Sequence, residues 1–529
     1  MAVLSLTTCL MLVVITLVAC IGLLLAAFVL FVHYQHLKYA HIPSPPRRGF
    51  FNGHMDLISS YKKRNMAIAE AFADIMRECG PVFHIFFYFS PMVVVLESDF
   101  VKDILCTSTH QKPSSIYRIF VRVFGTRFLG SGIAADTNPV THDAKRALLN
   151  PAFHRNGEKM NFLFTHWFRD FQGLMCLSRY LQGMMRQFNA GADVLIDKLS
   201  HKADGKTKVA MLDEFNRTTL DVIAKVAFGM DLKATRDDKS IFNQAITMSF
   251  RGLAVAMTSP MTEINPFPAA RKIKNEVRES IRFLRETGRR CIEERLRAIE
   301  KQEEVPNDIL THILKEIDQL KGDGQFDMEG LVDEFLTFFI AGQETTANLL
   351  SFTLLELGHH PEIMHRLKTE VEAVLGDKEY LEYTDISQLT YMMQVFKEVL
   401  RLWPPVTGTM REMAGDVNVK GYKIPKGSMV MVNTYVMARM EEYFHDPLQF
   451  DPDRFKASDD KPQYAYFPFS LGRHNCIGQQ FALIEARVLL ARLLHKFNFD
   501  LVPGQAHEIL DEVTLKPMGR CRNYLRLAE

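Results

Sequence analysis

The sequence predicts a mainly α-helical protein with small β-sheets, preceded by one N-terminal transmembrane helix. Three observations predict this class. A long uncharged apolar run opens the chain, several later stretches carry apolar residues at helical spacing, and only short β-branched and aromatic runs favour strands. The 529 residues are 47% hydrophobic and 24% charged, which fits a folded protein with a large core.

The first expected element is the membrane helix, at residues 2–32. This run contains no Asp, Glu, Lys or Arg, and it exceeds the ~20 residues that a helix needs to cross a bilayer. A cleaved signal peptide is the alternative, but its apolar region is shorter and follows a positive segment that is missing here. Lys38, Arg47 and Arg48 follow the run, so the positive-inside rule places the body in the cytosol.

Residues 33–50 are expected to form a proline-rich hinge. Pro43, Pro45 and Pro46 restrict the backbone and favour a stiff segment, although a plain linker is the alternative. Residues 51–529 are expected to form one large catalytic domain, because no Pro/Gly/Ser-rich linker interrupts them.

The body begins with a hairpin signal. Residues 81–87 and 92–96 are β-branched and aromatic runs on either side of Ser90 and Pro91. Residues 278–299, 362–375 and 481–497 show helical periodicity, and a shorter strand pair is expected within 417–432. No repeat of fixed period is present, which excludes solenoids and propellers.

Charge and cysteine spacing exclude several function classes. The formal net charge is +1, so no basic field favours a nucleic-acid partner. The eight cysteines contain no CxxC pair and no short-spaced framework, which argues against a zinc site and against a secreted disulfide scaffold.

One cysteine, Cys476, has surroundings that matter chemically, since it directly precedes the helical stretch 479–494. Amide groups and the dipole at a helix start favour a thiolate, which is the form that binds iron. Gly472 and Gly478 let the backbone turn tightly and approach a flat porphyrin, and Phe469 can cover the sulfur. For a lone cysteine, simple packing ahead of a helix is the alternative.

Residues 469–478 carry Phe469, Gly472, Cys476 and Gly478 at a spacing that closely resembles the haem-binding signature of cytochromes P-450. The resemblance implies the cytochrome P-450 fold and a haem b cofactor (iron protoporphyrin IX) with Cys476 as the axial iron ligand. Thiolate ligation favours O–O cleavage, so the implied activity is that of a haem-dependent monooxygenase.

Glu398 and Arg401 lie three residues apart and share a helix face, which is also common on solvated helices. With Arg454 in the segment 452–455, they resemble the ExxR and PxRF elements of the family. The resemblance implies a buried structural network of these three residues.

Residues 338–346 resemble the long central helix that passes over the distal haem face. Gly342 is expected to permit a local widening of this helix. Thr345 and Glu344 are assigned to a relay for the two protons that cleave bound dioxygen. An N-cap or an exposed turn is the alternative for this polar pair.

Arg146 and Arg411 fall where the family places arginines that bind the haem propionates. Two positions depart from the family pattern. His142 stands where the family usually has Trp, and His474 stands where relatives usually have Arg. His474 can still donate a hydrogen bond, but it carries no fixed charge at neutral pH.

Residues 277–285, 304–311, 434–440, 466–482 and 501–505 resemble the cholesterol 24-hydroxylase subfamily. This resemblance implies a large apolar substrate, with Phe120, Val121 and Ala341 as candidate contacts. Residues 155–181 match nothing in that subfamily and are expected to be an insertion.

The implied function is sterol hydroxylation by a single-pass protein of the endoplasmic reticulum membrane. Dioxygen and NADPH-derived electrons are required, and an NADPH-cytochrome reductase is the expected partner because no dinucleotide or flavin motif is present. Three alternatives remain open: a monooxygenase for another lipid, a family member that rearranges oxygenated substrates, and a non-catalytic haem or sterol-binding membrane protein.

Overall fold

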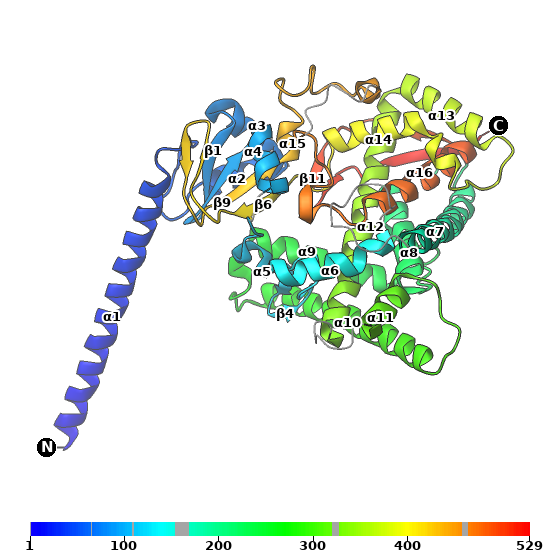
Figure 1. Cartoon of the computed structure of the whole chain (residues 1–529). Coiled ribbons are helices and arrows are strands. Elements are labelled where there is room, and N and C mark those ends of the chain that lie inside the picture. The colour runs from blue at the N-terminus through cyan, green and yellow to red at the C-terminus, as the bar shows by residue number, and fades with distance from the viewer. Residues whose placement is uncertain are drawn as a thin grey trace.

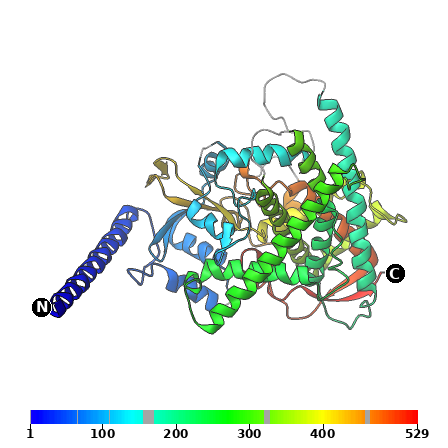
Figure 2. The same ribbon diagram turned by 90° about the horizontal axis from the view of Figure 1, so that it is seen from below.

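Helices make up most of the protein, as the sequence predicts, and short strands form small sheets (Figure 1). The structure is a computed structural model that describes residues 2–64, 66–107, 110–153, 169–319, 327–456 and 464–528. The N-terminus and the C-terminus lie at opposite ends of the molecule in both views (Figures 1 and 2).

The helices are α1 (Ala2–Tyr39), α2 (Met55–Lys63), α3 (Ile68–Cys79), α4 (Ser98–Lys102), α5 (Ser114–Val121), α6 (Pro139–Phe153), α7 (Arg169–Ser200), α8 (Met211–Phe228), α9 (Ile241–Thr258), α10 (Pro268–Glu300), α11 (Ile309–Gln319), α12 (Met328–His359), α13 (Pro361–Leu375), α14 (Thr390–Leu402), α15 (Thr434–Met437) and α16 (Gln479–Lys496). The strands are β1 (Val82–Phe87), β2 (Ser90–Val95), β3 (Arg122–Val123), β4 (Thr126–Arg127), β5 (Val209–Ala210), β6 (Gly408–Glu412), β7 (Val417–Val419), β8 (Tyr422–Ile424), β9 (Met429–Asn433), β10 (Phe497–Leu501), β11 (Ile509–Asp511), β12 (Leu515–Pro517) and β13 (Arg522–Leu527).

The largest sheet among the described residues has the order β1-β2-β9-β6. The predicted hairpin is β1 and β2, which pair antiparallel from Val82↔Val95 to Phe87↔Ser90. The predicted strands within 417–432 are the hairpin β7–β8 and most of β9. Phe497 was expected to end a helix, but it begins β10 and pairs with Leu527 of β13.

Helix α12 runs through the centre of the body and is buried on every side along most of its length. Phe335 and Phe339 pack against Phe228 of α8, with ring centroids 4.4 and 5.1 Å from the Phe228 ring. A helix that is apolar all round must be covered on all faces. The surrounding helices supply this cover, so α12 fixes where they lie.

Gly342 contributes to this packing in a way the sequence did not predict. Helix α12 runs as one α-helix from Met328 to His359, past Gly342, where a local widening is expected. A Cβ at Gly342 would lie 3.0 Å from Ile223 Cγ1 of α8. The glycine therefore allows α8 and α12 to approach closely.

Helix α1 is the one helix of the described residues that is long and apolar enough to cross a membrane, over Thr8–Tyr39. It ends at Tyr39 rather than at residue 32, and its last turns are buried against the body at Val32 and Tyr39. The Tyr39 hydroxyl lies 2.8 Å from the Ser428 hydroxyl. The expected hinge at 33–50 is therefore helical at its start and fastened to the body.

The segment after Tyr39 is also held in place. The backbone N–H of His84 in β1 donates to the Pro43 carbonyl at 2.8 Å, and His84 Nδ1 lies 3.0 Å from the Ile42 carbonyl. Of the expected insertion at 155–181, residues 155–168 lie outside the described part of the chain, and 169–181 form the first turns of α7.

Candidate functional site

The loop that carries Cys476 is closed by its own backbone. The Ser470 N–H donates to the Phe467 carbonyl at 2.9 Å, and the Cys476 N–H donates to the Phe469 carbonyl at 2.8 Å. The turn Gly472–His474 precedes Cys476, and α16 begins three residues after it. These bonds give the cysteine a fixed position at a helix start, as the sequence predicts.

The two glycines of this loop have different surroundings. Gly472 has a φ of +66°, and a Cβ there would lie 2.0 Å from the Leu105 carbonyl oxygen, in the turn Asp103–Thr107. Gly478 has a φ of −86°, and an added Cβ would meet no atom within 4 Å. A side chain at position 472 would collide with the protein's own backbone, so glycine is required there. A side chain at position 478 would have room.

Cys476 retains accessible surface although protein surrounds most of it. Burial raises the pKa of its thiol, and the Gly478 N–H and the Arg146 guanidinium act in the opposite direction. An amide donor and a cation beside the sulfur both stabilise a thiolate.

Helix α12 also exposes surface at its midpoint. Ala341 is exposed and Thr345 is half-buried, although most of their neighbours on the helix are buried. The two residues share a face, and the Thr345 hydroxyl donates to the Ala341 carbonyl at 2.7 Å. Accessible atoms in the middle of a core helix indicate a space beside this face.

Glu344 does not bond to Thr345 in this structure. Its Oε1 accepts from Lys516 Nζ of β12 at 3.1 Å, and its side chain is almost fully buried. The expected acid and alcohol are therefore adjacent in sequence, and each has its own partner.

Arg411 on β6 is 2% exposed. Its Nη1 donates to the Thr409 hydroxyl at 2.9 Å and to the Met410 carbonyl at 2.8 Å, while its Nη2 is buried without a partner among the described residues. Burial lowers the pKa of Arg411. A buried guanidinium with a free donor fits a carboxylate ligand such as a haem propionate.

The two residues that depart from the family pattern contact each other. His142 Nε2 lies 3.0 Å from His474 Nδ1, and the ring centroids are 4.2 Å apart. Burial lowers the pKa of His142 to about 4 and that of His474 to about 2. Both rings are therefore neutral at pH 7, and one donates to the other.

Arg146 on α6 binds the cysteine loop itself. Its Nη1 donates to the Asn475 carbonyl at 2.9 Å and its Nη2 to Asn475 Oδ1 at 2.5 Å. The guanidinium thus connects α6 to the residue before Cys476.

Lys112 is a residue of this region that the sequence reasoning missed. It is 9% exposed, and its Nζ donates to the carbonyls of Ile133 and Ala134 at 3.0 Å each. Burial lowers its pKa to about 7, and its charge acts on His142 and His474. No sequence signal marks it, because a lysine before a proline is ordinary.

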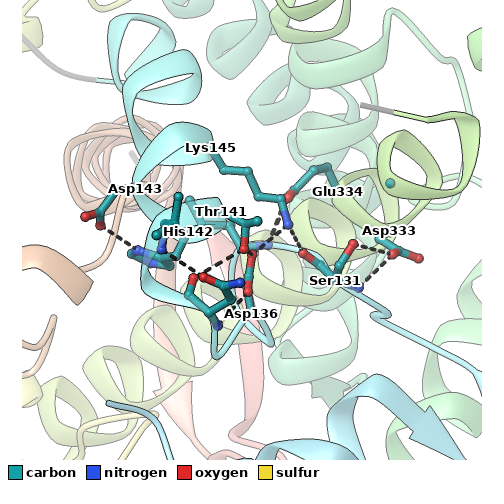
Figure 3. A network of polar contacts seen from close by, with 12 residues as sticks. Ser131, Asp136, Thr141, His142, Asp143, Lys145, Asp333 and Glu334 are labelled. Atoms are coloured by element: carbon teal, nitrogen blue, oxygen red, sulfur yellow. Dashed lines mark hydrogen bonds and ion pairs between the residues drawn. The ribbon is translucent and has the colours of Figure 1, made fainter. Parts of the chain in front are cut away.

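The loop that Lys112 binds is held by a polar network between α6 and α12 (Figure 3). Lys145 of α6 donates to Asp136 at 2.8 Å, and Glu334 of α12 accepts from the Ile133 N–H at 2.9 Å. The Ser131 N–H donates to Asp333 at 2.7 Å. Burial raises the pKa of Glu334 to about 7.

The structure brings Glu398, Arg401 and Arg454 together. Arg401 donates to both Glu398 carboxylate oxygens at 2.7 Å, and both side chains are fully buried. Arg454 Nε lies 3.3 Å from Glu398 Oε1. Arg401 also donates to the carbonyls of Ala438 and Pro447, so it joins α14 to the chain that follows β9.

The candidate substrate contacts come from two helices, α5 and α12. Phe120 and Val121 are half-buried at the end of α5, where their carbonyls accept from the N–H groups of Leu129 and Phe128. Ala341 lies on the accessible face of α12.

Comparisons with known proteins indicate a single family. The family model described as Cytochrome P450 matches residues 43–176 and 174–520, and these two matches meet inside the expected insertion. Cytochrome P450 72A13 of Arabidopsis thaliana is 31% identical over 435 residues, which cover 78% of each chain. Cytochrome P450 4d2 of Drosophila melanogaster is 28% identical over 450 residues, covering 81% of this chain and 82% of that protein.

A solved structure gives the same indication for the fold. It is described as the crystal structure of cytochrome P450DA heme domain, and the likeness has a TM-score of 0.78 at 23% identity. It covers 92% of this chain and 98% of that chain.

We expect Glu398→Gln to lower the free energy of unfolding by about 3–5 kcal/mol, because Arg401 would keep a buried charge without its carboxylate. Urea unfolding measures this loss. Glu276→Gln is the control, since the Glu276–Lys272 pair is exposed and 3.9 Å long, and it should change stability by less than about 1 kcal/mol. Equal effects of the two variants would contradict a buried network.

We expect Gly472→Ala to cost at least about 1–2 kcal/mol from its left-handed backbone, with a further loss from the Leu105 contact. Gly478→Ala should stay within about 0.5 kcal/mol, because its Cβ meets open space. Urea denaturation midpoints of the two variants measure these losses of stability. A tolerated alanine at 472 would show that the close approach to Leu105 is not needed.

Proposed function

The chain belongs to the cytochrome P450 family, and from this premise we propose that it is a membrane-anchored sterol hydroxylase that performs cholesterol 24-hydroxylation. Membership makes it a haem-dependent monooxygenase that uses dioxygen, a substrate and a redox partner. The observation that carries the site assignment is the fixed loop with an accessible Cys476 beside Arg146. The sterol assignment rests on the resemblance of stretches such as 277–285 and 501–505.

In this proposal the Cys476 thiolate would hold the haem iron. Arg411 supplies a free buried donor for a propionate. The neutral pair His142–His474 stands in place of the usual Trp and Arg: His142 Nδ1 donates to Asp143 Oδ1 at 3.3 Å, and His474 Nδ1 donates to His142 Nε2 at 3.0 Å. Arg146 keeps the loop in position through Asn475. A thiolate-ligated haem supplies oxygen activation and insertion.

In the same proposal, Thr345 and Glu344 of α12 transfer protons. The Thr345 hydroxyl is on the accessible face of α12 and would hold a proton at its oxygen for the dioxygen chemistry that a haem would supply there. Glu344 supplies the acid next to it. Ala341, Phe120 and Val121 are the proposed apolar contacts for the sterol, and the low polarity of these side chains suits such a substrate.

Electrons come from an NADPH-cytochrome reductase, and α1 anchors the protein in the endoplasmic reticulum membrane with the body in the cytosol. Aromatic contacts support a body close to the bilayer, since Phe28 of α1 lies 5.9 Å from the Phe51 ring and 5.3 Å from the Phe89 ring. Aromatic residues are favoured at membrane interfaces. The connection between α9 and α10 also exposes apolar side chains: Met261, Ile264 and Phe267.

The second candidate function is that of a monooxygenase for another lipid. The names of several relatives support this candidate. One relative at 29% identity is the cytokinin hydroxylase of Arabidopsis thaliana, and another at 28% is secologanin synthase 1 of Catharanthus roseus. Members at this level of identity therefore carry the names of quite different substrates.

The first test compares wild type with Cys476→Ser in membranes. We expect the reduced, carbon monoxide-bound wild type to show the Soret band of a thiolate-ligated haem, and we expect the variant to lose it because an alcohol does not replace a thiolate. Cys291→Ser is the matched control, since Cys291 is half-buried on α10 outside the site. An unchanged band in Cys476→Ser would refute the ligand assignment.

The substrate is tested with the same membranes, reductase and NADPH. We expect cholesterol to yield 24-hydroxycholesterol in wild type and none in Cys476→Ser, as measured by mass spectrometry. A thiolate band without this product would leave the monooxygenase in place and turn the assignment to another lipid.

The topology has a test of its own. We expect an N-glycosylation sequon appended before Ala2 to be modified in microsomes, because the positive-inside rule places that end in the lumen. The natural sequon at Asn216 should stay unmodified on the cytosolic side. Modification of Asn216 alone would reverse the proposed orientation.

A further inference from the structure

A buried carboxylate near the C-terminal end of α12 has histidines as its ion-pair partners. Glu356 is 2% exposed. Within the described residues, its carboxylate oxygens lie 3.5 Å from His360 Nδ1 and 3.2 Å from His507 Nε2. A buried charge needs a counter-charge or a hydrogen-bond donor. The pairing of Glu356 therefore depends on groups that are cations only when protonated.

His507 is the partner that comes from a distant part of the chain. It lies between β10 and β11, whereas His360 directly follows α12. The His507 side chain is 35% exposed, so it can exchange a proton with water. Its Nε2 is buried and forms no aligned hydrogen bond among the described residues, so its attraction to Glu356 depends on charge.

The His507 ring also stacks on Trp403, which follows α14. The two ring centroids are 5.5 Å apart, and the ring planes differ by 4°. The Trp403 Nε1–H donates to Glu356 Oε1, which is the oxygen nearest His507. The imidazole is therefore placed against an acid and an indole that also contact each other.

Three further ionisable groups face this cluster. The His359 ring lies 4.5 Å from the His507 ring, and Glu508 is the exposed neighbour of His507 in sequence. The guanidinium carbon of Arg439 lies 5.1 Å from the centre of a Trp403 ring, and its N–H groups donate to two backbone carbonyls. An arginine and an exposed glutamate keep their charges between about pH 6 and pH 8.5, so a change of charge in this range comes from the histidines.

Glu356 raises the pKa of His507 above the usual histidine value, although burial acts in the opposite direction. A base whose pKa is higher in the folded protein than in the unfolded chain stabilises the fold while it is protonated. This contribution is complete below about pH 6.5, and it is lost as the pH rises through the pKa of the folded state.

Bonds on either side of His507 contain no group that titrates in this range. Gln505 Nε2 donates to the Arg522 carbonyl at 2.6 Å, and the Arg522 N–H donates to Gln505 Oε1 at 2.8 Å. In the β11–β12 hairpin, Thr514 Oγ1 accepts from Asn348 Nδ2 of α12 at 3.1 Å. A change in the charge of His507 therefore acts on the segment 506–508, between these anchored points.

We propose that His507 and Glu356 form a pH-sensitive switch that fastens the segment 506–508 to the end of α12. At acidic pH the imidazolium pairs with Glu356 and lies against Trp403. At alkaline pH the neutral ring keeps the stack but loses the charge pair, so the chain that leads into the β11–β12 hairpin is held less firmly. The switch is independent of the haem site and of the proposed substrate.

A double-mutant cycle on the full-length holoprotein in detergent micelles measures the pair. Wild type, Glu356→Gln, His507→Phe and the double variant are unfolded in urea. His507→Phe keeps an aromatic ring against Trp403 but carries no charge. We expect a coupling of about fivefold in the unfolding constant at about pH 6, and of less than about twofold at about pH 8.5.

Trp403 provides a second readout that does not require the Glu356 variant to fold. The chain has two tryptophans, so Trp167→Phe leaves Trp403 as the remaining one. A protonated imidazole in contact with an indole quenches its fluorescence. Trp403 emission should therefore increase as the pH rises from about 6 to about 8.5, and adding His507→Phe should abolish this increase.

The His495–Glu372 pair is the matched control, because it has a length of 3.1 Å and side chains that are 31% and 69% exposed. The same cycle with Glu372→Gln and His495→Phe should give less than about twofold at both pH values. Equal coupling of His507 and Glu356 at both pH values would overturn the switch in favour of stacking alone, and absence of coupling would overturn it as well. An increase in Trp403 emission that survives His507→Phe would assign the titration to another group and exclude His507.

Discussion

The burial of α12 is the constraint on which the rest of the structure depends. A helix of this length with apolar side chains on every face is stable only when other elements cover it, and each polar group on it needs a partner. Asp333 accepts from Arg127 and Arg285. Farther along the helix, Glu334 is bound by the loop after β4 and Glu344 by the C-terminal hairpin. Pairing of buried charges therefore draws distant segments onto one helix.

Accessible surface within the buried stretch of α12 occurs at residues of the proposed chemistry. Ala341 and Thr345 are accessible within the otherwise buried stretch of α12, and Cys476 is accessible in its loop. A rigid surround is what such a site needs, because small displacements of a ligand or a proton donor have large effects on rate. The buried Glu398–Arg401 pair contributes to this rigidity by fastening α14 to the segment after β9.

The pairing of His142 with His474 shows how two departures from a family pattern can compensate for each other. Either histidine alone would place a polar ring in a buried position next to Lys112 and the guanidinium of Arg411. Together they satisfy one hydrogen bond and remain neutral, which avoids adding charge to a cationic region. The Nη2 of Arg411, which has no partner among the described residues, can bind an anion here.

The sequence by itself determined the helical class, the long apolar N-terminal helix, the β1–β2 hairpin and the cysteine loop, because periodicity, uncharged length and motif spacing are local properties of the chain. It could also group Glu398 with Arg401, since three residues along a helix share a face. The role of Gly342 in the approach of α8, the buried Lys112, the contact between His142 and His474, and the attachment of Glu344 to Lys516 were decided only by tertiary structure. Each of these joins residues far apart in the sequence, and their contacts depend on packing rather than on any local pattern.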